Sequence, residues 1–263
     1  MTVLTLTTDF GIKDGFVGTM KGVIWGICPS AQIADISHSI TPQNVLEGAF
    51  VLWRAYPFFP AGSVHVAVID PGVGTRRRPI AAHLGLHYFV GPDNGLFTPI
   101  FEDAERNGWA KEIVHLKNKK YFLSEVSHTF HGRDIFAPVG AAIANGVPLG
   151  DLGPAIYDPV RLTMPKVEKT LTGWRAHVTL VDIFGNLSTD LPASALEGHE
   201  SVVFHLLGQE VPGLVDSYGQ EQPGALVALV DSENFIEIAA VNASAANVLG
   251  AQTGDIVEVI FKS

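Results

Sequence analysis

Three short segments combine acidic, basic and aromatic residues in patterns that could do chemistry. The first, VIDPGVGTRRRPI (residues 68–80), ends an apolar run in one carboxylate, Asp70, followed by a glycine turn and the arginines Arg76, Arg77 and Arg78. A carboxylate at the end of an apolar run is partly desolvated and needs a partner, which a nearby arginine can provide. The turn glycines allow a ligand to approach the backbone closely. Asp70 is therefore a candidate site residue, with a structural turn acid as the alternative.

The second segment, SHTFHGRDIF (127–136), supplies His131, Arg133 and Asp134 just ahead of an expected helix. His131 could be a catalytic group or a helix cap. Asp134 could simply favour the positive end of the helix, and Arg133 could be a surface group. A metal site of His131 with Asp9 and Asp70 is conceivable. Because no recognised metal-ligand spacing is present, we expect no bound metal.

The third segment, LVDIFGNLSTD (180–190), places Asp182, Phe184 and Asn186 around a Gly-Asn turn. Phe184 could be a core residue and Asn186 a plain turn residue. Together they could also offer an aromatic face beside an amide. That combination suits a purine, which stacks on a ring and pairs its edge with a donor and an acceptor.

Two further acids end expected strands, Asp9 in TLTTDFG and Asp35 in ADISHS, where His38 follows. For Asp35 a helix cap or turn former is the favoured interpretation. The turn DPGVGT resembles a phosphate loop only weakly, because it lacks the Lys-Ser/Thr pair and no GxGxxG opens a helix here.

Composition excludes several classes of protein. The chain has 263 residues and a net charge of −10, which argues against a nucleic-acid surface. No run approaches the roughly 18 uninterrupted apolar residues of a membrane helix, and we expect no signal peptide at the N-terminus. The single cysteine, Cys28, excludes an intramolecular disulfide and suits a reducing cytoplasm.

Hydrophobic periodicity predicts alternating strands and helices in the first half of the chain. The expected strands are 3–8, 32–37, 63–70 and two short ones within 79–90; the expected helices are 14–27, 44–56 and 133–146. This alternation predicts an α/β domain with a mainly parallel sheet covered on both faces.

The pattern changes after about residue 150. The stretch 156–170 is rich in proline and has no long periodic element, so we expect a linker there, after an α/β domain over 1–155. Over 171–263, short alternating runs separated by Gly, Asn and Ser predict a small all-β, barrel-like domain.

Six motifs give the chain a resemblance to a known family: TLTTDFGIKDGFVG, DISHSITPQNVLEGAF, VHVAVIDPGVGTRRRPI, VGPDNGLFTP, TFHGRDIFAP and VDIFGNLSTD. They resemble the S-adenosyl-L-methionine (SAM) hydroxide adenosyltransferases, the SAM hydrolases related to fluorinase and chlorinase. The resemblance runs from about residue 3 to about residue 260. It implies a homotrimer that binds SAM between the α/β domain of one subunit and the β-barrel of its neighbour. It also implies attack of water on the ribose C5′, giving adenosine and L-methionine without a metal or cofactor.

The resemblance also implies roles for individual residues. The catalytic set would be Asp70, Arg77 and His131, with Arg76 and Arg78 as ordinary neighbours. Asp9 would hold the ribose hydroxyls, and Asp14 and Asp182 the methionine ammonium. Phe184 would pack on adenine and Asn186 would bond its edge. Further substrate contacts would come from Thr129, Phe130 and Ser232.

Some positions depart from the halogenases within this resemblance. Where those enzymes place hydroxyl groups around the halide, this sequence has Asp70, Val73 and Gly132. Glu233 stands where halogenases have an arginine for the methionine carboxylate, so the sequence does not say how that carboxylate is held. A hydrolase is therefore expected. The alternatives are a SAM-dependent halogenase and a SAM- or nucleoside-binding protein without turnover.

Overall fold

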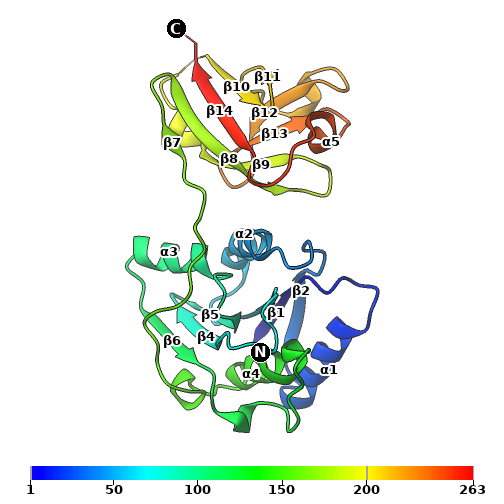
Figure 1. Ribbon diagram of the computed structural model, residues 1–263, viewed down its shortest axis with the longest axis vertical. Helices are drawn as coiled ribbons and strands as arrows, with labels where there is room; N and C mark the ends of the chain where they lie inside the picture. Colours follow the sequence, from blue (N-terminus) through cyan, green and yellow to red (C-terminus); the bar gives the residue numbers. More distant parts are fainter. Residues whose placement is uncertain (1, 200, 263) are drawn as a thin grey trace. The chain divides into compact units, whose positions relative to one another are not determined.

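The computed structural model describes residues 2–199 and 201–262. It divides into two compact units, one ending at Leu162 and the other beginning at Thr163 (Figure 1). This division lies inside the stretch 156–170 for which the sequence predicts a linker. Among the described residues, no helix has the length and apolar character needed to span a membrane.

The first unit is built on a six-stranded sheet with the order β2-β1-β3-β5-β4-β6. Its strands are β1 (Val3–Thr8), β2 (Gln32–Ser37), β3 (Val64–Val68), β4 (Pro79–Leu84), β5 (His87–Pro92) and β6 (Lys111–His115). The pairs among β2, β1, β3 and β5 are parallel, and both pairs made by β4 are antiparallel. The expected mainly parallel α/β fold is confirmed.

Helices cover both faces of this sheet (Figure 1). They are α1 (Phe16–Ile27), α2 (Val45–Ala55), α3 (Thr98–Arg106) and α4 (Ala137–Ala144). Successive residues of β3 point to opposite faces: Val66 joins the core beneath α1 and α4, and Ala67 joins the core beneath α2 and α3. This is why the strand is apolar on both faces apart from the buried His65.

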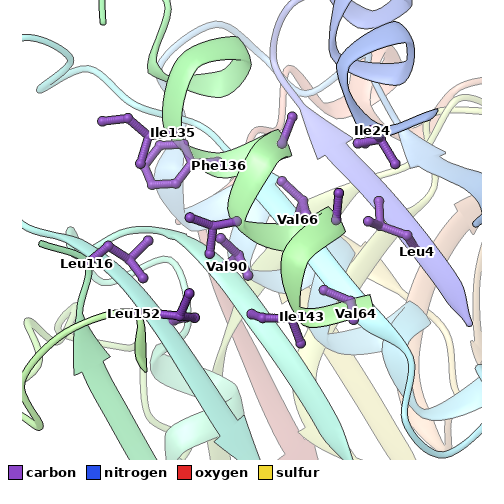
Figure 2. Close-up of a cluster of buried hydrophobic side chains, with 14 of the residues drawn as sticks. Leu4, Ile24, Val64, Val66, Val90, Leu116, Ile135, Phe136, Ile143 and Leu152 are labelled. Atoms are coloured by element: carbon purple, nitrogen blue, oxygen red, sulfur yellow. The ribbon is translucent and has the colours of Figure 1, made fainter. Parts of the chain in front are cut away.

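The core beneath α4 is tightly packed, as Figure 2 shows for side chains from β1, β3, β5 and α4. A Cβ added at Gly140 in α4 would lie 2.5 Å from Cγ2 of Val66. The glycine therefore permits the close approach of helix and strand. Each fully buried aliphatic side chain in such a core contributes about 1.5–3 kcal/mol to folding.

The register of the parallel strands brings distant polar residues to one edge. Thr8 at the end of β1 lies beside Val68 at the end of β3, and Thr7 lies beside Ser37 at the end of β2. The residues that follow these strands, Asp9, Asp70 and His38, therefore leave the sheet at its carboxyl edge. In open α/β sheets this is the edge where ligands bind.

Some elements of the first unit were not expected. A turn of π-helix, Gly132–Phe136, precedes α4, so the expected helix 133–146 is a composite that ends earlier. No pattern in the sequence predicted α3 or β6. Asp35 is neither a cap nor a turn residue, because it lies within β2 and its carboxylate accepts a bond from Lys21 Nζ at 2.6 Å.

The second unit is an antiparallel, nearly closed barrel. The strand order is β11-β10-β14-β8-β9-β13-β12, with β7 paired to β8. Its strands are β7 (Glu168–Lys169), β8 (Gly173–Val181), β9 (Leu187–Pro192), β10 (Val202–Leu206), β11 (Gln209–Val211), β12 (Leu226–Val230), β13 (Phe235–Ala240) and β14 (Ile256–Phe261). One short helix, α5 (Ala245–Leu249), was not expected. The expected all-β, barrel-like unit is confirmed.

The long strand β8 gives the barrel its curvature. Its first half pairs with β14 and its second half with β9, and its pairing to β9 carries a shift in register. A register shift of this kind bends a strand and increases its twist. Apolar side chains of β8, β9, β10, β13 and β14 then fill one common core.

A buried histidine pair lies beneath α2 in the first unit. His65 Nδ1 is 2.8 Å from Thr5 Oγ1, and His65 Nε2 is 3.2 Å from Nδ1 of His87. Burial, and then the neighbouring His87, lower the pKa of His65 to about 3, and burial lowers the pKa of His87 as well. Both rings are therefore neutral at neutral pH. The rings of Tyr56, Phe59 and Phe89 surround the pair. The hydroxyl of Tyr56 donates a hydrogen bond to Asp103, and the charge of His83 contributes to the lowered pKa of His87.

This pair predicts a specific acid sensitivity. The folded pKa of His65 lies below the unfolded value of about 6.5, so stability is present above that pH and falls as the pH decreases toward 3. By pH 4.5 we expect a loss on the order of 2 kcal/mol from this group. His65→Gln should flatten the dependence of the unfolding free energy on pH, measured by urea denaturation. His128→Gln, at an exposed position, is the control, and parallel curves for wild type and His65→Gln would contradict the prediction.

Candidate functional site

Asp70 lies at the start of a tight turn directly after β3. The turn is closed by a bond from Val73 N to the Asp70 carbonyl at 3.2 Å. Gly74 has a φ of +76°, and a Cβ there would lie 2.3 Å from the carbonyl oxygen of His128. Only glycine fits this position. The turn therefore packs directly against the segment that carries the second group of candidate residues.

Arg77 returns from this turn to pair with Asp70. Its Nε lies 2.9 Å from each carboxylate oxygen, and its terminal NH2 group also bonds to Oδ2. The two side chains are almost fully buried, with 4% of Asp70 and 9% of Arg77 exposed. The guanidinium also lies over the ring of Phe136, 5.1 Å from its centroid. The sequence-based expectation of a desolvated acid with an arginine partner matches this geometry.

His131 completes the cluster. Its Nδ1 lies 2.7 Å from the NH2 group of Arg77. Because a guanidinium can only donate, Nδ1 accepts this bond, and Nε2 carries the proton of the neutral ring. Burial, followed by the nearby Arg77 cation, lowers the pKa of His131, although Asp70 acts in the opposite direction. The imidazole is therefore neutral at neutral pH.

Asp134 holds the loop before His131 in place. Its Oδ2 accepts bonds from the backbone N of Ser127 at 2.8 Å and from Ser127 Oγ at 2.6 Å. Its other oxygen accepts a bond from Arg133 Nε. Burial acts to raise the pKa of Asp134, but the hydrogen bonds from Arg133 and Ser127 and the Arg133 charge outweigh it and lower the pKa overall. Asp134 therefore fastens the loop rather than acting only on the helix end.

Asp9 lies at the same edge of the sheet. Its Oδ2 accepts a bond from the backbone N of Gln43 at 2.8 Å. The next residue, Phe10, packs edge-to-face on Phe130, with ring centroids 5.8 Å apart. A Cβ at Gly132 would lie 3.3 Å from the ring of Phe10. The segments carrying Asp9 and His131 are thus in contact.

The two remaining candidates of the first unit are exposed. Asp14 lies in the loop before α1, and Thr129 lies in the loop before the π-helical turn. The structure of this unit therefore brings Asp9, Asp70, Arg77, Phe130 and His131 to one edge, with Asp14 and Thr129 on surrounding loops.

The three consecutive arginines have three different environments. Arg76 is exposed, as expected for an ordinary neighbour. Arg78 is not an ordinary neighbour. Its Nε lies 2.7 Å from Oδ2 of the buried Asp93, and its NH1 group lies 2.8 Å from Oδ1 of Asp158. Arg78 thus ties the segment leaving the first unit to the sheet, a role that the sequence did not suggest.

In the second unit, Asp182 organises the turn between β8 and β9. Its Oδ1 accepts bonds from the backbone N of Phe184 at 2.9 Å and of Asn186 at 2.8 Å. Its Oδ2 accepts the side-chain amide of Asn186 at 3.1 Å. Gly185 has a φ of +82°, and a Cβ there would lie 2.0 Å from Oγ of Ser244. The turn therefore needs its glycine.

This turn forms one side of a cleft of about 620 Å³ within the second unit. Phe184 is 74% exposed, so it is not a core residue, whereas Asn186 is buried. Ser232 lies in the exposed turn between β12 and β13. The cleft is lined by Asp182, Phe184, Asn186, Tyr218, Ala240, Asn242 and Ala243.

Tyr218 is the lining residue that sequence reasoning missed. Its hydroxyl donates to Oε1 of the buried Glu237 at 2.6 Å. Burial, and then this carboxylate, raise the pKa of Tyr218, so the phenol stays protonated. Its segment, DSYGQ, has no periodicity and no recognisable spacing, so the sequence contained no signal for it.

The conceivable metal site of Asp9, Asp70 and His131 finds no support in the geometry. Within residues 2–199 and 201–262, no group of three or more His, Cys, Asp or Glu side chains is arranged to hold a metal ion. The oxygens of Asp70 and Nδ1 of His131 instead face the Arg77 guanidinium.

Comparison with known proteins adds a second line of evidence. Two protein-family models match this chain. The model described as SAM hydroxide adenosyltransferase N-terminal domain matches residues 4–153, and the model described as SAM hydroxide adenosyltransferase C-terminal domain matches residues 176–258. A (R)-S-adenosyl-L-methionine hydrolase of Salinispora tropica is 41% identical and covers 97% of both chains. A fluorinase of an Actinoplanes species is 30% identical over 74% of this chain and 73% of its own. The crystal structure of an uncharacterized conserved protein from Thermotoga maritima has a TM-score of 0.89 at 37% identity, covering 98% of this chain and 100% of its own.

The cluster predicts how His131 titrates. Arg77→Met removes a cation that lowers the pKa of His131 and leaves the Asp70 carboxylate, which raises it. The pKa of His131 should therefore rise in this variant, as measured by NMR titration of the imidazole. Arg76→Met is the matched control because Arg76 is exposed, and it should leave the titration unchanged. An unchanged or lower pKa in Arg77→Met would contradict the arrangement.

Proposed function

The chain belongs to the SAM hydroxide adenosyltransferase family, and on this premise we propose that it hydrolyses S-adenosyl-L-methionine to adenosine and L-methionine. A water oxygen bonds to the ribose C5′ while the bond between C5′ and sulfur breaks. The electron pair of that bond stays on sulfur, which becomes the neutral thioether of methionine, and one water proton is released. The observation that carries the proposal is the cluster of Asp70, Arg77 and His131 in a chain that is similar over 97% of its length to a named hydrolase.

Asp70 is the group best suited to accept the proton from water. A carboxylate has about four acceptor positions, and Arg77 occupies three of them, so Oδ1 keeps room for one more donor. His131 is less suited, because Nδ1 already accepts from Arg77 and Nε2 carries the ring proton. General-base assistance of this kind accelerates a reaction by typically 10²–10⁴-fold.

Arg77 acts as the positioning group. Its three bonds fix the plane of the Asp70 carboxylate, and its bond to His131 fixes that ring. A water held between Asp70 and the ribose C5′ would then be aligned for in-line attack. Such alignment lowers the activation barrier, because the water has already lost the translational and rotational freedom that it would otherwise lose in the transition state.

The leaving group simplifies the rest of the mechanism. A sulfonium departs as a neutral thioether, so neither a general acid nor a Lewis acid is required. We therefore propose a metal-independent reaction in which SAM is the substrate and no cofactor takes part. A cytoplasmic location is proposed as well, since the free, buried thiol of Cys28 suits a reducing compartment.

The substrate contacts divide between the two units. In the first unit, Asp9 would bind the ribose hydroxyls, and Asp14, Thr129 and Phe130 would surround the substrate. In the second unit, Phe184 offers an exposed ring for adenine. Asn186 keeps its side-chain oxygen and one amide hydrogen for the adenine edge after bonding to Asp182.

The methionine end is assigned to acidic and hydroxyl groups. Asp182 would take the ammonium through the free acceptor capacity of Oδ2, and Asp14 would assist it. Ser232 would contact the same end of the substrate. Because position 233 is a glutamate, no basic side chain at this position holds the methionine carboxylate.

We also propose a homotrimer in which each site combines the first unit of one subunit with the second unit of its neighbour. The proposal is supported by the distribution of the candidates. The cluster of Asp70, Arg77 and His131 lies wholly within the first unit, and the cleft with Phe184 and Asn186 lies wholly within the second. Cyclic symmetry would then complete every site in the same way.

A halogenase is the nearest alternative. One position that would carry a halide-binding hydroxyl is Gly132, where a Cβ would lie 3.2 Å from Sδ of Met20 and 3.3 Å from the ring of Phe10. Another is Asp70, an anion that repels a halide. Both features favour water as the nucleophile.

The products decide between these possibilities. Wild-type protein with SAM should release adenosine and L-methionine, with or without EDTA, as measured by chromatography. Asp70→Asn should keep the fold and SAM binding while single-turnover release slows by about 10²–10⁴-fold. A halogenase would form 5′-halo-5′-deoxyadenosine in the presence of halide, and a binding protein would return SAM unchanged. A wild-type rate in Asp70→Asn would remove Asp70 from the mechanism.

Mixed assemblies test the shared site. Subunits carrying Asp70→Asn and subunits carrying Asn186→Ala should each be nearly inactive alone. Co-expressed, they should form some sites with the first unit of an Asn186→Ala subunit and the second unit of an Asp70→Asn subunit. Those sites carry both wild-type groups, so activity should exceed the sum of the two variants. If hybrids of verified mixed composition never exceed that sum, each site lies within a single chain.

A further inference from the structure

His38 occupies a buried position directly after β2, beside the Asp9 loop. It is 7% exposed, and its Nδ1 lies 2.8 Å from Oγ1 of Thr8, the last residue of β1. On its other side, Nε2 lies 3.1 Å from Oδ1 of Asp35. The second oxygen of Asp35 accepts a bond from Lys21 of α1 at 2.6 Å. The imidazole therefore connects the end of β1 to an ion pair between β2 and α1.

The Thr8 hydroxyl links the imidazole of His38 to the backbone of the Asp9 loop. The backbone N of Phe10 donates to Oγ1 of Thr8 at 3.3 Å. The same hydroxyl oxygen is hydrogen-bonded to Nδ1 of His38, whereas Nε2 makes only a close charge contact with Asp35, without hydrogen-bond geometry. Thr8 thus couples the imidazole of His38 to the backbone of Phe10.

The same residues fix the loop that carries Asp9. The backbone N of Gly11 donates to the carbonyl of His38 at 2.8 Å. Oδ2 of Asp9 accepts from the backbone N of Gln43, a non-glycine residue with a φ of +68°. The Asp9 carboxylate is thus bounded by Phe10 and Gly11 on one side and by the segment after His38 on the other.

We propose that His38 is a positioning residue for the nucleoside end of the substrate, acting through Thr8 and the loop of Phe10 and Gly11 to orient the Asp9 carboxylate. This inference rests on the proposed function, in which Asp9 binds the ribose hydroxyls. It assigns His38 to affinity and to selectivity for ribose, and it leaves the chemistry of Asp70 unaffected.

Two amide substitutions separate the two ends of the imidazole. The amide of His38→Asn reaches the position of Nδ1 and can still bond to Thr8. The amide of His38→Gln reaches the position of Nε2 and cannot bond to Thr8. Thr8→Val removes the hydroxyl with almost no change in volume and tests the same link if the histidine variants fold poorly. His83→Asn in β4, which is separated from β1 by β3 and β5, is the matched control.

The main readout is the ratio of affinities for adenosine and 2′-deoxyadenosine, measured by calorimetry. We expect His38→Gln and Thr8→Val to lower the affinity for adenosine by about tenfold. They should change the affinity for 2′-deoxyadenosine far less, because one hydroxyl that Asp9 binds is missing from it. His38→Asn and His83→Asn should keep the wild-type ratio. In SAM hydrolysis, His38→Gln should raise KM with little change in kcat.

An equal loss of affinity for both nucleosides in His38→Gln and Thr8→Val would overturn the inference, since it would indicate a general structural role. A fall in kcat at unchanged KM would overturn it as well. The nucleoside ratio requires no turnover, so it decides the role of His38 even if SAM is not hydrolysed. Failure of wild-type turnover would in contrast count only against the proposed function.

Discussion

The buried pair of Asp70 and Arg77 is the interaction on which the candidate site depends. Removing two charges from water costs several kcal/mol for each ion, and only a close, well-oriented pair offsets that cost. The surrounding structure supplies the orientation. A glycine turn reverses the chain so that Arg77 faces Asp70, the carbonyl of His128 closes over that turn, and the ring of Phe136 covers the guanidinium. An acid paired in this way is held still, which a positioned base requires.

The parallel sheet explains how residues so far apart in sequence come to one edge. The strands β2, β1 and β3 are adjacent and parallel, so their carboxyl ends lie side by side. Each end then carries one polar group: His38, Asp9 and Asp70. His131, which caps the π-helical turn before α4, reaches the same edge from a segment much later in the sequence. In the barrel unit the candidate residues are instead close in sequence, because a single glycine turn carries Asp182, Phe184 and Asn186.

Much of this arrangement could be predicted because the signals were local. The apolar run of β3 ending in Asp70, the glycine turn and a nearby arginine are contiguous in the sequence, and the strand and helix periods of β1, α1, β2 and α2 are clear. What escaped prediction depends on contacts between distant segments. Arg78 differs from Arg76 only through Asp93 and Asp158, and Tyr218 belongs to the cleft only because the barrel brings its loop there. Asp35 was misassigned because its partner, Lys21, lies one helix away.

The crowding around Gly132 has a consequence for how this protein can evolve. Met20 is fully buried, and the ring of Phe10 packs on both Phe16 and Phe130, so any side chain at position 132 must displace neighbours that are themselves constrained. Overpacking of this kind typically costs about 1–3 kcal/mol. A smaller residue at position 20 would relieve part of this crowding. The effects of substitutions at positions 20 and 132 on stability are therefore coupled through packing, so the cost of a side chain at position 132 depends on which residue position 20 already carries.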